Sequence, residues 1–145
     1  MKTYNPVLHD VSKVFFDATI PLASEGIFRN GDTLIYISQY NDILMPAYCP
    51  ILRGDADSHT CGSYEPVLGF VTRLIWSNGT LLASVCWDLA QSACNYPRAN
   101  YPCPEFGYET AHGGILLKPF IIKALWLSTK PSCFTTGDLQ WTKQA

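Results

Sequence analysis

"GFVTRLIWSNGTLLASVCW", residues 69–87, is the stretch that decides the fold. Two runs of β-branched, aromatic and other apolar residues flank the pair Asn78-Gly79. Asn-Gly is the strongest short-range hairpin signal, because a type I′ turn requires positive φ at both central residues and these residue types tolerate it best. Alternate residues of each run share one face, as they do in a strand. The stretch therefore predicts a β-hairpin over 69–87.

The rest of the chain continues this pattern of short strands and turns. Two apolar runs flank "RNGD" and predict a second hairpin over 13–40. Segments 120–128 and 133–141 have the composition of strands. The segment near 88–114 is rich in proline and glycine, which predicts a long loop with little regular structure. The predicted fold is all-β, a single domain over 1–145 built as an antiparallel sandwich, jelly roll or barrel.

The chain carries unusually few charges. Only 15% of its residues are charged, whereas soluble domains typically have about 25%. A surface with so few charges is poorly protected against association, so we expect contact with copies of itself or with a larger protein assembly. The net charge is −2 and acids and bases are interspersed, so no basic patch marks a nucleic-acid partner.

The sequence gives conflicting indications of where the protein is located. Polar residues interrupt every apolar run in 1–26, so no cleavable signal is expected. The apolar stretch 115–127 holds two lysines and a proline and is too short to span a bilayer, so no membrane insertion is expected. Six cysteines and the sequon that begins at Asn78 instead favour an oxidising compartment. A virion assembled in the host cytoplasm and an extracellular location therefore both remain open.

The cysteine spacings favour disulfides or buried thiols over a metal centre. There is no Cys-x-x-Cys pair, which argues against a zinc ribbon or a thioredoxin-like site. Cys94 and Cys103 bracket a short loop and are the first pair we expect to be bridged, with Cys49 and Cys61 second. Asn78, at the predicted hairpin tip, is the candidate glycosylation site.

The loop between Cys49 and Cys61 contains a cell-adhesion tripeptide, Arg53, Gly54 and Asp55. A cysteine-bounded loop would present this guanidinium and carboxylate to an integrin. A tripeptide also occurs by chance, and Gly and Asp are common turn residues, so an incidental turn is the competing interpretation.

The same loop offers Asp55, Asp57 and His59 at alternate positions, which would share one face of an extended segment. That arrangement suggests a divalent cation and, as a third hypothesis, a metal-dependent hydrolase. The spacing matches neither an EF-hand loop nor a zinc site, so no metal or other cofactor is predicted.

Aromatic residues cluster within 96–108, where Tyr96, Tyr101 and Tyr108 have Arg98 and Asn100 among them. Exposed aromatics with polar neighbours bind glycans and proteins, and they also cover cores beneath long loops. Both interpretations remain open for this segment.

The sequence contains little that predicts catalysis. His112 lies in "AHGG" and Glu105 or Glu109 could orient it, but no nucleophile or Gly-x-Ser-x-Gly motif accompanies it. We therefore expect a non-enzymatic structural or interaction protein that builds or decorates a symmetric assembly, namely a virus or phage particle, as a capsid or capsid-decoration protein. The alternative is an extracellular disulfide-stabilised domain that binds an integrin or glycan through 49–61 or 96–108.

Overall fold

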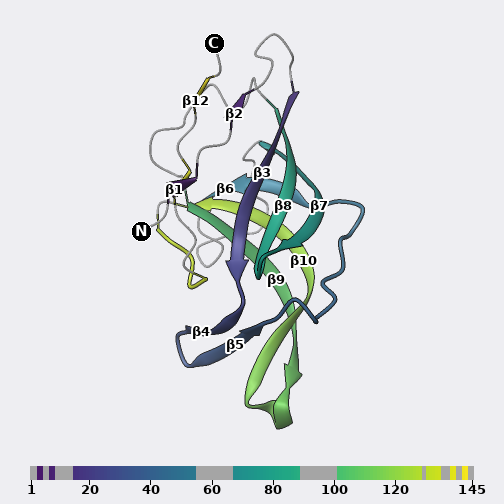
Figure 1. Cartoon of the computed structure of the whole chain (residues 1–145), viewed down its shortest axis with the longest axis vertical. Helices are drawn as coiled ribbons and strands as arrows, with labels where there is room; N and C mark the ends of the chain where they lie inside the picture. The colour runs from purple at the N-terminus through teal and green to yellow at the C-terminus, as the bar shows by residue number, and fades with distance from the viewer. Residues whose placement is uncertain are drawn as a thin grey trace.

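The all-β architecture expected from the sequence is confirmed in the computed structural model (Figure 1). The structure describes residues 3–4, 7–8, 15–54, 67–88, 101–128, 130–134, 138–139 and 142–143. Its strands are β1 (Thr3–Tyr4), β2 (Val7–Leu8), β3 (Phe15–Ser24), β4 (Gly26–Asn30), β5 (Thr33–Ile37), β6 (Pro50–Arg53), β7 (Gly69–Ser77), β8 (Thr80–Asp88), β9 (Tyr101–Ala111), β10 (Leu116–Ser128), β11 (Asp138–Leu139) and β12 (Thr142–Lys143), and a 3-10 turn, η2 (His112–Gly114), joins β9 to β10. Within these ranges no helix has the length and apolar character needed to cross a membrane.

One mixed sheet forms most of the molecule. Its strand order is β3-β8-β7-β6-β10-β5-β4, with β9 on the other side of β10, and it curls into a half-barrel (Figure 1). The expectation of a purely antiparallel sheet is wrong, because β10 runs parallel to both β5 and β6. Parallel neighbours need long crossover connections rather than tight turns, and sequence-local hairpin signals do not reveal them. Two short parallel pairs, β1 with β11 and β2 with β12, join the terminal segments.

The hairpin predicted from the opening stretch is confirmed as β7 and β8. Ser77 pairs with Thr80 across a two-residue loop. Asn78 has φ 51° and Gly79 has φ 76°, the two positive values that a type I′ turn requires. The predicted turn chemistry therefore sets the register of this pair.

The hairpin predicted over 13–40 is wrong in its pairing. β3 pairs antiparallel with β8, and the hairpin is formed by β4 and β5. The chain changes direction at Gly26, whose φ of 150° is a conformation that other residues rarely adopt. The two-residue loop of the hairpin is Gly31-Asp32, and the positive φ of 63° at its first position fits a type II′ turn.

Part of the predicted 88–114 loop is instead a strand. β9 pairs with β10 along its whole length, while 89–100 lie outside the described residues. Pro102 pairs with Leu127 and Pro104 with Leu125. Proline cannot donate a ladder hydrogen bond, so it is tolerated at a sheet edge, and in the described chain β9 has β10 as its one partner strand. These prolines, which resemble loop residues in the sequence, therefore mark an edge strand.

The two later predicted strands differ in outcome. The expectation for 120–128 is confirmed, because β10 contains it. Over 133–141 the structure has a turn at Cys133 and Phe134 and then only the two residues of β11, with the remaining positions outside the described part.

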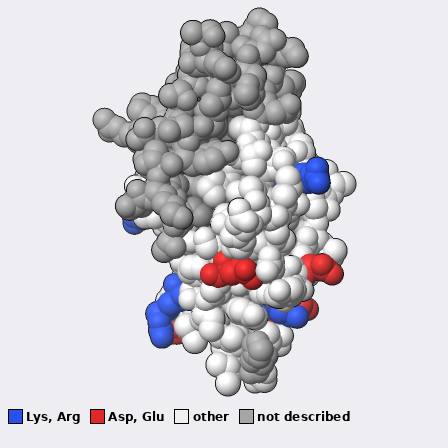
Figure 2. All heavy atoms as spheres, in the orientation of Figure 1, with Lys and Arg blue, Asp and Glu red and all other residues white. Residues whose placement is uncertain are grey.

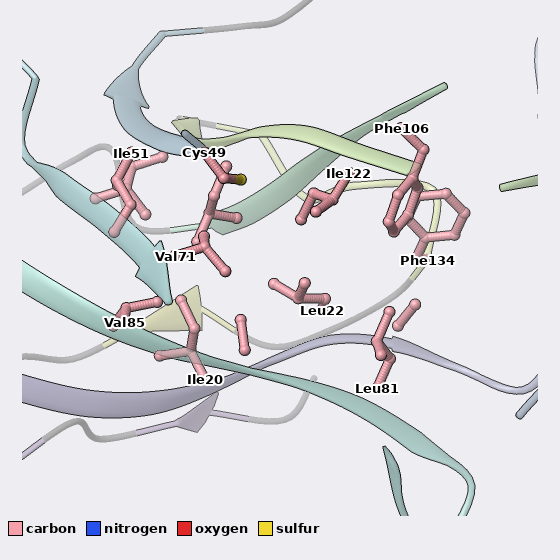
Figure 3. Close-up of a cluster of buried hydrophobic side chains, with 14 of the residues drawn as sticks. Ile20, Leu22, Cys49, Ile51, Val71, Leu81, Val85, Phe106, Ile122 and Phe134 are labelled. Carbon is pink, nitrogen blue, oxygen red and sulfur yellow. The ribbon is translucent and has the colours of Figure 1, made fainter. Parts of the chain in front are cut away.

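The hydrophobic core fills the inside of the half-barrel. In Figure 3 labelled side chains converge on it from facing walls of the sheet. Phe134 closes one end, with its ring 5.5 Å from that of Phe28 and 5.8 Å from that of Phe106. Each aliphatic side chain fully buried here contributes about 1.5–3 kcal/mol relative to exposure. The largest fully buried side chains are Ile20, Leu22, Ile35, Ile37, Ile51, Leu81, Ile122, Leu125, Leu127 and Val85.

Candidate interaction surface

The connection between β5 and β6, residues 38–49, is an irregular trace that runs beside β10 (Figure 1), where Leu44 forms an isolated parallel bridge with Ile121. Its middle is attached to β10. The Leu44 N–H donates to the Phe120 carbonyl at 2.8 Å, and the Ile122 N–H donates to the Leu44 carbonyl at 3.2 Å. Backbone hydrogen bonds therefore fix Leu44 beside Phe120, although the segment has no strand of its own.

The end of this connection is attached to β7. The Val71 N–H donates to the Cys49 carbonyl at 2.9 Å. One residue before Cys49 and one before Val71, the rings of Tyr48 and Phe70 meet edge to face, with their centroids 5.7 Å apart. Aromatic pairs in this geometry are mutually stabilising, so the two rings form a defined exposed pair.

Five large apolar side chains on and beside this connection are exposed, and we call them the apolar ridge. With about 200 Å² for a large side chain, their exposed parts amount to roughly 550 Å². A single contiguous patch of this area would be near the upper end for monomeric proteins, and such patches are often functional. The ridge consists of Tyr40 (86% exposed), Leu44 (60%), Tyr48 (59%), Phe70 (38%) and Phe120 (37%).

A local irregularity in β10 makes Phe120 an extra residue of this strand, with its ring over Gly107 of β9. Tyr108 of β9 pairs with Pro119, and the next pair is Gly107 with Ile121. The register shift between them leaves Phe120 without a partner on β9. A Cβ at Gly107 would be 2.7 Å from Ile121 Cγ2 and 3.4 Å from Phe120 Cε1. The absence of a side chain at Gly107 therefore lets both neighbouring side chains lie across β9.

Few charges border the ridge, and one of them is the exposed Lys123, whose Cε and the Phe120 ring both lie within 3.4 Å of the Cβ position at Gly107. Figure 2 shows a face that is mostly uncharged in its described part, with a few separate acidic and basic groups. Asp42, exposed, lies on the Tyr40 side of Leu44. Arg73 is exposed on β7, two residues after Val71. Because Val71 is hydrogen-bonded to Cys49, Arg73 lies near the Cys49 end of the connection. Neither has an ion pair within the described chain, so the ridge has an unpaired acid toward one end and an unpaired base toward the other.

The predicted adhesion tripeptide begins inside the sheet. Arg53 ends β6 in register with Leu127, and the Gly54 N–H donates to the Leu127 carbonyl at 2.9 Å. Gly54 has φ 128°, and a Cβ there would be 3.5 Å from the Trp126 ring. Gly54 therefore has a structural reason to be glycine. Asp55 lies outside the described residues, as do Asp57, His59 and Cys61, so integrin and metal binding here stay predictions.

The two described members of the predicted aromatic binding set, Tyr101 and Tyr108, do not share one exposed surface. Tyr101 begins β9 and is half-buried, whereas Tyr108 lies near its other end and packs against the core. Burial raises the pKa of the Tyr108 hydroxyl, and Cys133 and Glu105 add to this. Tyr96 lies outside the described residues, so a glycan or receptor contact through 96–108 stays a prediction.

The cysteines expected to form bridges are only partly described. Cys49 is a thiol in the core, 1% exposed, and burial raises its pKa to about 12, which makes it a poor nucleophile at neutral pH. Cys103 Sγ lies 3.6 Å from the Lys130 carbonyl oxygen. Cys61 and Cys94 lie outside the described residues, so both bridges stay predictions.

Two of the polar residues considered for catalysis, Glu105 and Glu109, make structural contacts. Glu105 accepts a hydrogen bond from Trp126 Nε1 at 2.9 Å, and Glu109 is 3.4 Å from Lys118 Nζ, its cross-strand neighbour. In the described ranges no three His, Cys, Asp or Glu side chains group as metal ligands. Asn78 is exposed at the hairpin tip, as a glycosylation acceptor must be, and its modification stays a prediction.

Sequence reasoning missed the apolar ridge. The available signal was a large apolar residue at every fourth position, Tyr40, Leu44 and Tyr48, in a segment bounded by strands. No family model matches this sequence, and no curated protein or solved structure matches it either. What the chain does is therefore inferred from its own surface.

Proposed function

We propose that this chain is a non-enzymatic structural or interaction protein that builds or decorates a symmetric protein assembly. We further propose that the assembly is a virus or phage particle, in which the chain serves as a capsid or capsid-decoration protein. The observation that carries the proposal is the apolar ridge, which leaves roughly 550 Å² of apolar side chain in water.

The size of the ridge supports a protein partner. A standard protein interface buries about 800 Å² on each side, so the ridge alone would supply about two thirds of one. Tyr and Phe dominate it, and aromatic residues are enriched at interface centres. Water around such side chains is released on association, which is the main driving force for binding between proteins.

The low charge of the chain supports a permanent rather than an occasional partner. With 15% charged residues and a net charge of −2, little electrostatic repulsion keeps copies apart. A β-framework with backbone hydrogen bonds at Leu44 and Cys49 also holds the ridge in one shape, which limits the entropy lost on association. The extracellular RGD-binding alternative has less support, because Gly54 has a structural role at the end of β6.

Light scattering after size-exclusion chromatography tests the proposal. We expect the wild-type chain to form a species larger than a monomer whose mass rises between about 1 µM and about 100 µM. Leu44→Asp should shift it toward the monomer, because it places a charge in the ridge. Ile115→Asp is the matched control, since Ile115 is also exposed (74%) but lies at the β9–β10 turn. A wild-type monomer across this range, with no binding to a larger assembly, would contradict the proposal.

A further inference from the structure

We infer that the apolar ridge pairs with the same ridge of a second copy of this chain, antiparallel about a two-fold axis that passes close to Leu44. This inference rests on the proposed function and specifies the first contact of the assembly. A two-fold interface uses the same patch on both subunits, so the patch must be complementary to itself.

The order of residues along the ridge meets this requirement. Tyr40 and Tyr48 lie four residues on either side of Leu44, so the connection is the same in both directions at these positions. Antiparallel pairing would place Leu44 against Leu44 of the second copy and each tyrosine against the other tyrosine. The backbone of Phe120, whose carbonyl accepts a hydrogen bond from the Leu44 N–H, would lie next to the axis, with the Phe120 ring toward Gly107.

The charges select the antiparallel arrangement. Asp42 lies toward the Tyr40 end of Leu44, and Arg73 lies toward the Tyr48 end. Rotation about an axis at Leu44 brings each Asp42 toward the Arg73 of the other copy, which forms two symmetric acid–base contacts. A parallel arrangement would instead bring Asp42 toward Asp42 and Arg73 toward Arg73, and like charges in contact are unfavourable.

The area fits a dimer of this kind. Two ridges would together bury roughly 1,100 Å², above the value of about 1,000 Å² that a specific interface should exceed. The exposed apolar side chains form the centre, and the two charged pairs lie at the rim, where they determine orientation more than affinity.

A charge exchange followed by sedimentation equilibrium tests the inference. Asp42→Arg and Arg73→Asp should each weaken dimerisation by roughly tenfold or more, because each change turns two attractive contacts into repulsive ones. The double variant Asp42→Arg/Arg73→Asp should regain wild-type dimerisation to within about threefold, since its contacts are attractive again. Arg29→Asp is the matched control, because Arg29 is exposed on β4, away from the ridge, and should have no effect.

Salt provides a second measurement on the same variants. At about 1 M salt the charges are screened within about 3 Å, so the differences between variants should shrink while apolar association persists. Association of the wild-type chain with no rescue in the double variant would overturn this inference and leave the proposed function intact. A wild-type chain that stays monomeric up to about 100 µM would overturn the inference whatever the variants do.

Discussion

The variant Gly107→Ala tests the strand register that brings Phe120 into the ridge. A Cβ at this position would lie 2.7 Å from Ile121 Cγ2, whereas carbon atoms in contact are normally about 3.5–4.0 Å apart. The Ile121 side chain or one of the two strands must therefore move by about 1 Å. Overpacking of this kind costs about 1–3 kcal/mol. Replacing glycine in a strand returns up to about 1 kcal/mol, so the expected net loss of stability is about 1–2 kcal/mol.

Urea unfolding followed by tryptophan fluorescence measures this loss. An unchanged m-value, the slope of the unfolding free energy against urea concentration, would show that the folded state keeps its compactness. The matched control is Ile121→Leu, because leucine has no Cγ2 atom. The double variant Gly107→Ala/Ile121→Leu should recover about 1 kcal/mol relative to the sum of the single changes. Equal stability of Gly107→Ala and the wild type, or strict additivity in the double variant, would show that Ile121 does not lie over Gly107.

Three further predictions concern the core and its polar neighbours. Leu22→Ala should lower the free energy of unfolding by about 2–5 kcal/mol in urea, because Leu22 is fully buried, and a loss under about 1 kcal/mol would place it outside the core. Glu105→Ala should cost about 1.5–3 kcal/mol by removing the acceptor of the Trp126 indole N–H, whereas Glu105→Gln should cost less, and equal losses would argue against this bond. Burial raises the pKa of Cys49 from 9.0 to about 12 and also raises that of Tyr108. The unfolded chain therefore loses these protons first, so stability should fall as pH rises from about 9 toward about 12, and a flat profile would contradict their burial.

Local turn chemistry made part of this fold predictable. Asn78 and Gly79 adopt the positive φ values that the sequence indicated, so β7 and β8 could be placed from their own residues. The partner of β3 could not, because β8 is far away in the sequence and no local feature identifies it. Pro102 and Pro104 were interpreted as loop residues because sequence does not reveal which strand lies at an edge.

The ridge was beyond sequence reasoning for a related reason. Tyr40, Leu44 and Tyr48 are residue types common in cores, and their exposure depends on how the connection is held by β10 at Leu44 and by β7 at Cys49. By contrast, the sequence indicates Gly54 only as part of an adhesion motif. Its contacts with Trp126 and Leu127 depend on tertiary structure and could not be predicted. Residue types that can bind or catalyse are easy to find in a sequence, but the solvent exposure of a side chain depends on its tertiary contacts.

Hydrogen–deuterium exchange at two protein concentrations tests most directly the claim that copies of this chain meet through the ridge. Backbone amides of the connection 40–48 should exchange more slowly at about 100 µM than at about 1 µM, because association covers them. The amides at the exposed turn around Asn78 serve as the internal reference and should exchange equally at both concentrations. Unchanged exchange over 40–48, in a sample that light scattering shows to be associated, would place the contact elsewhere and contradict the account.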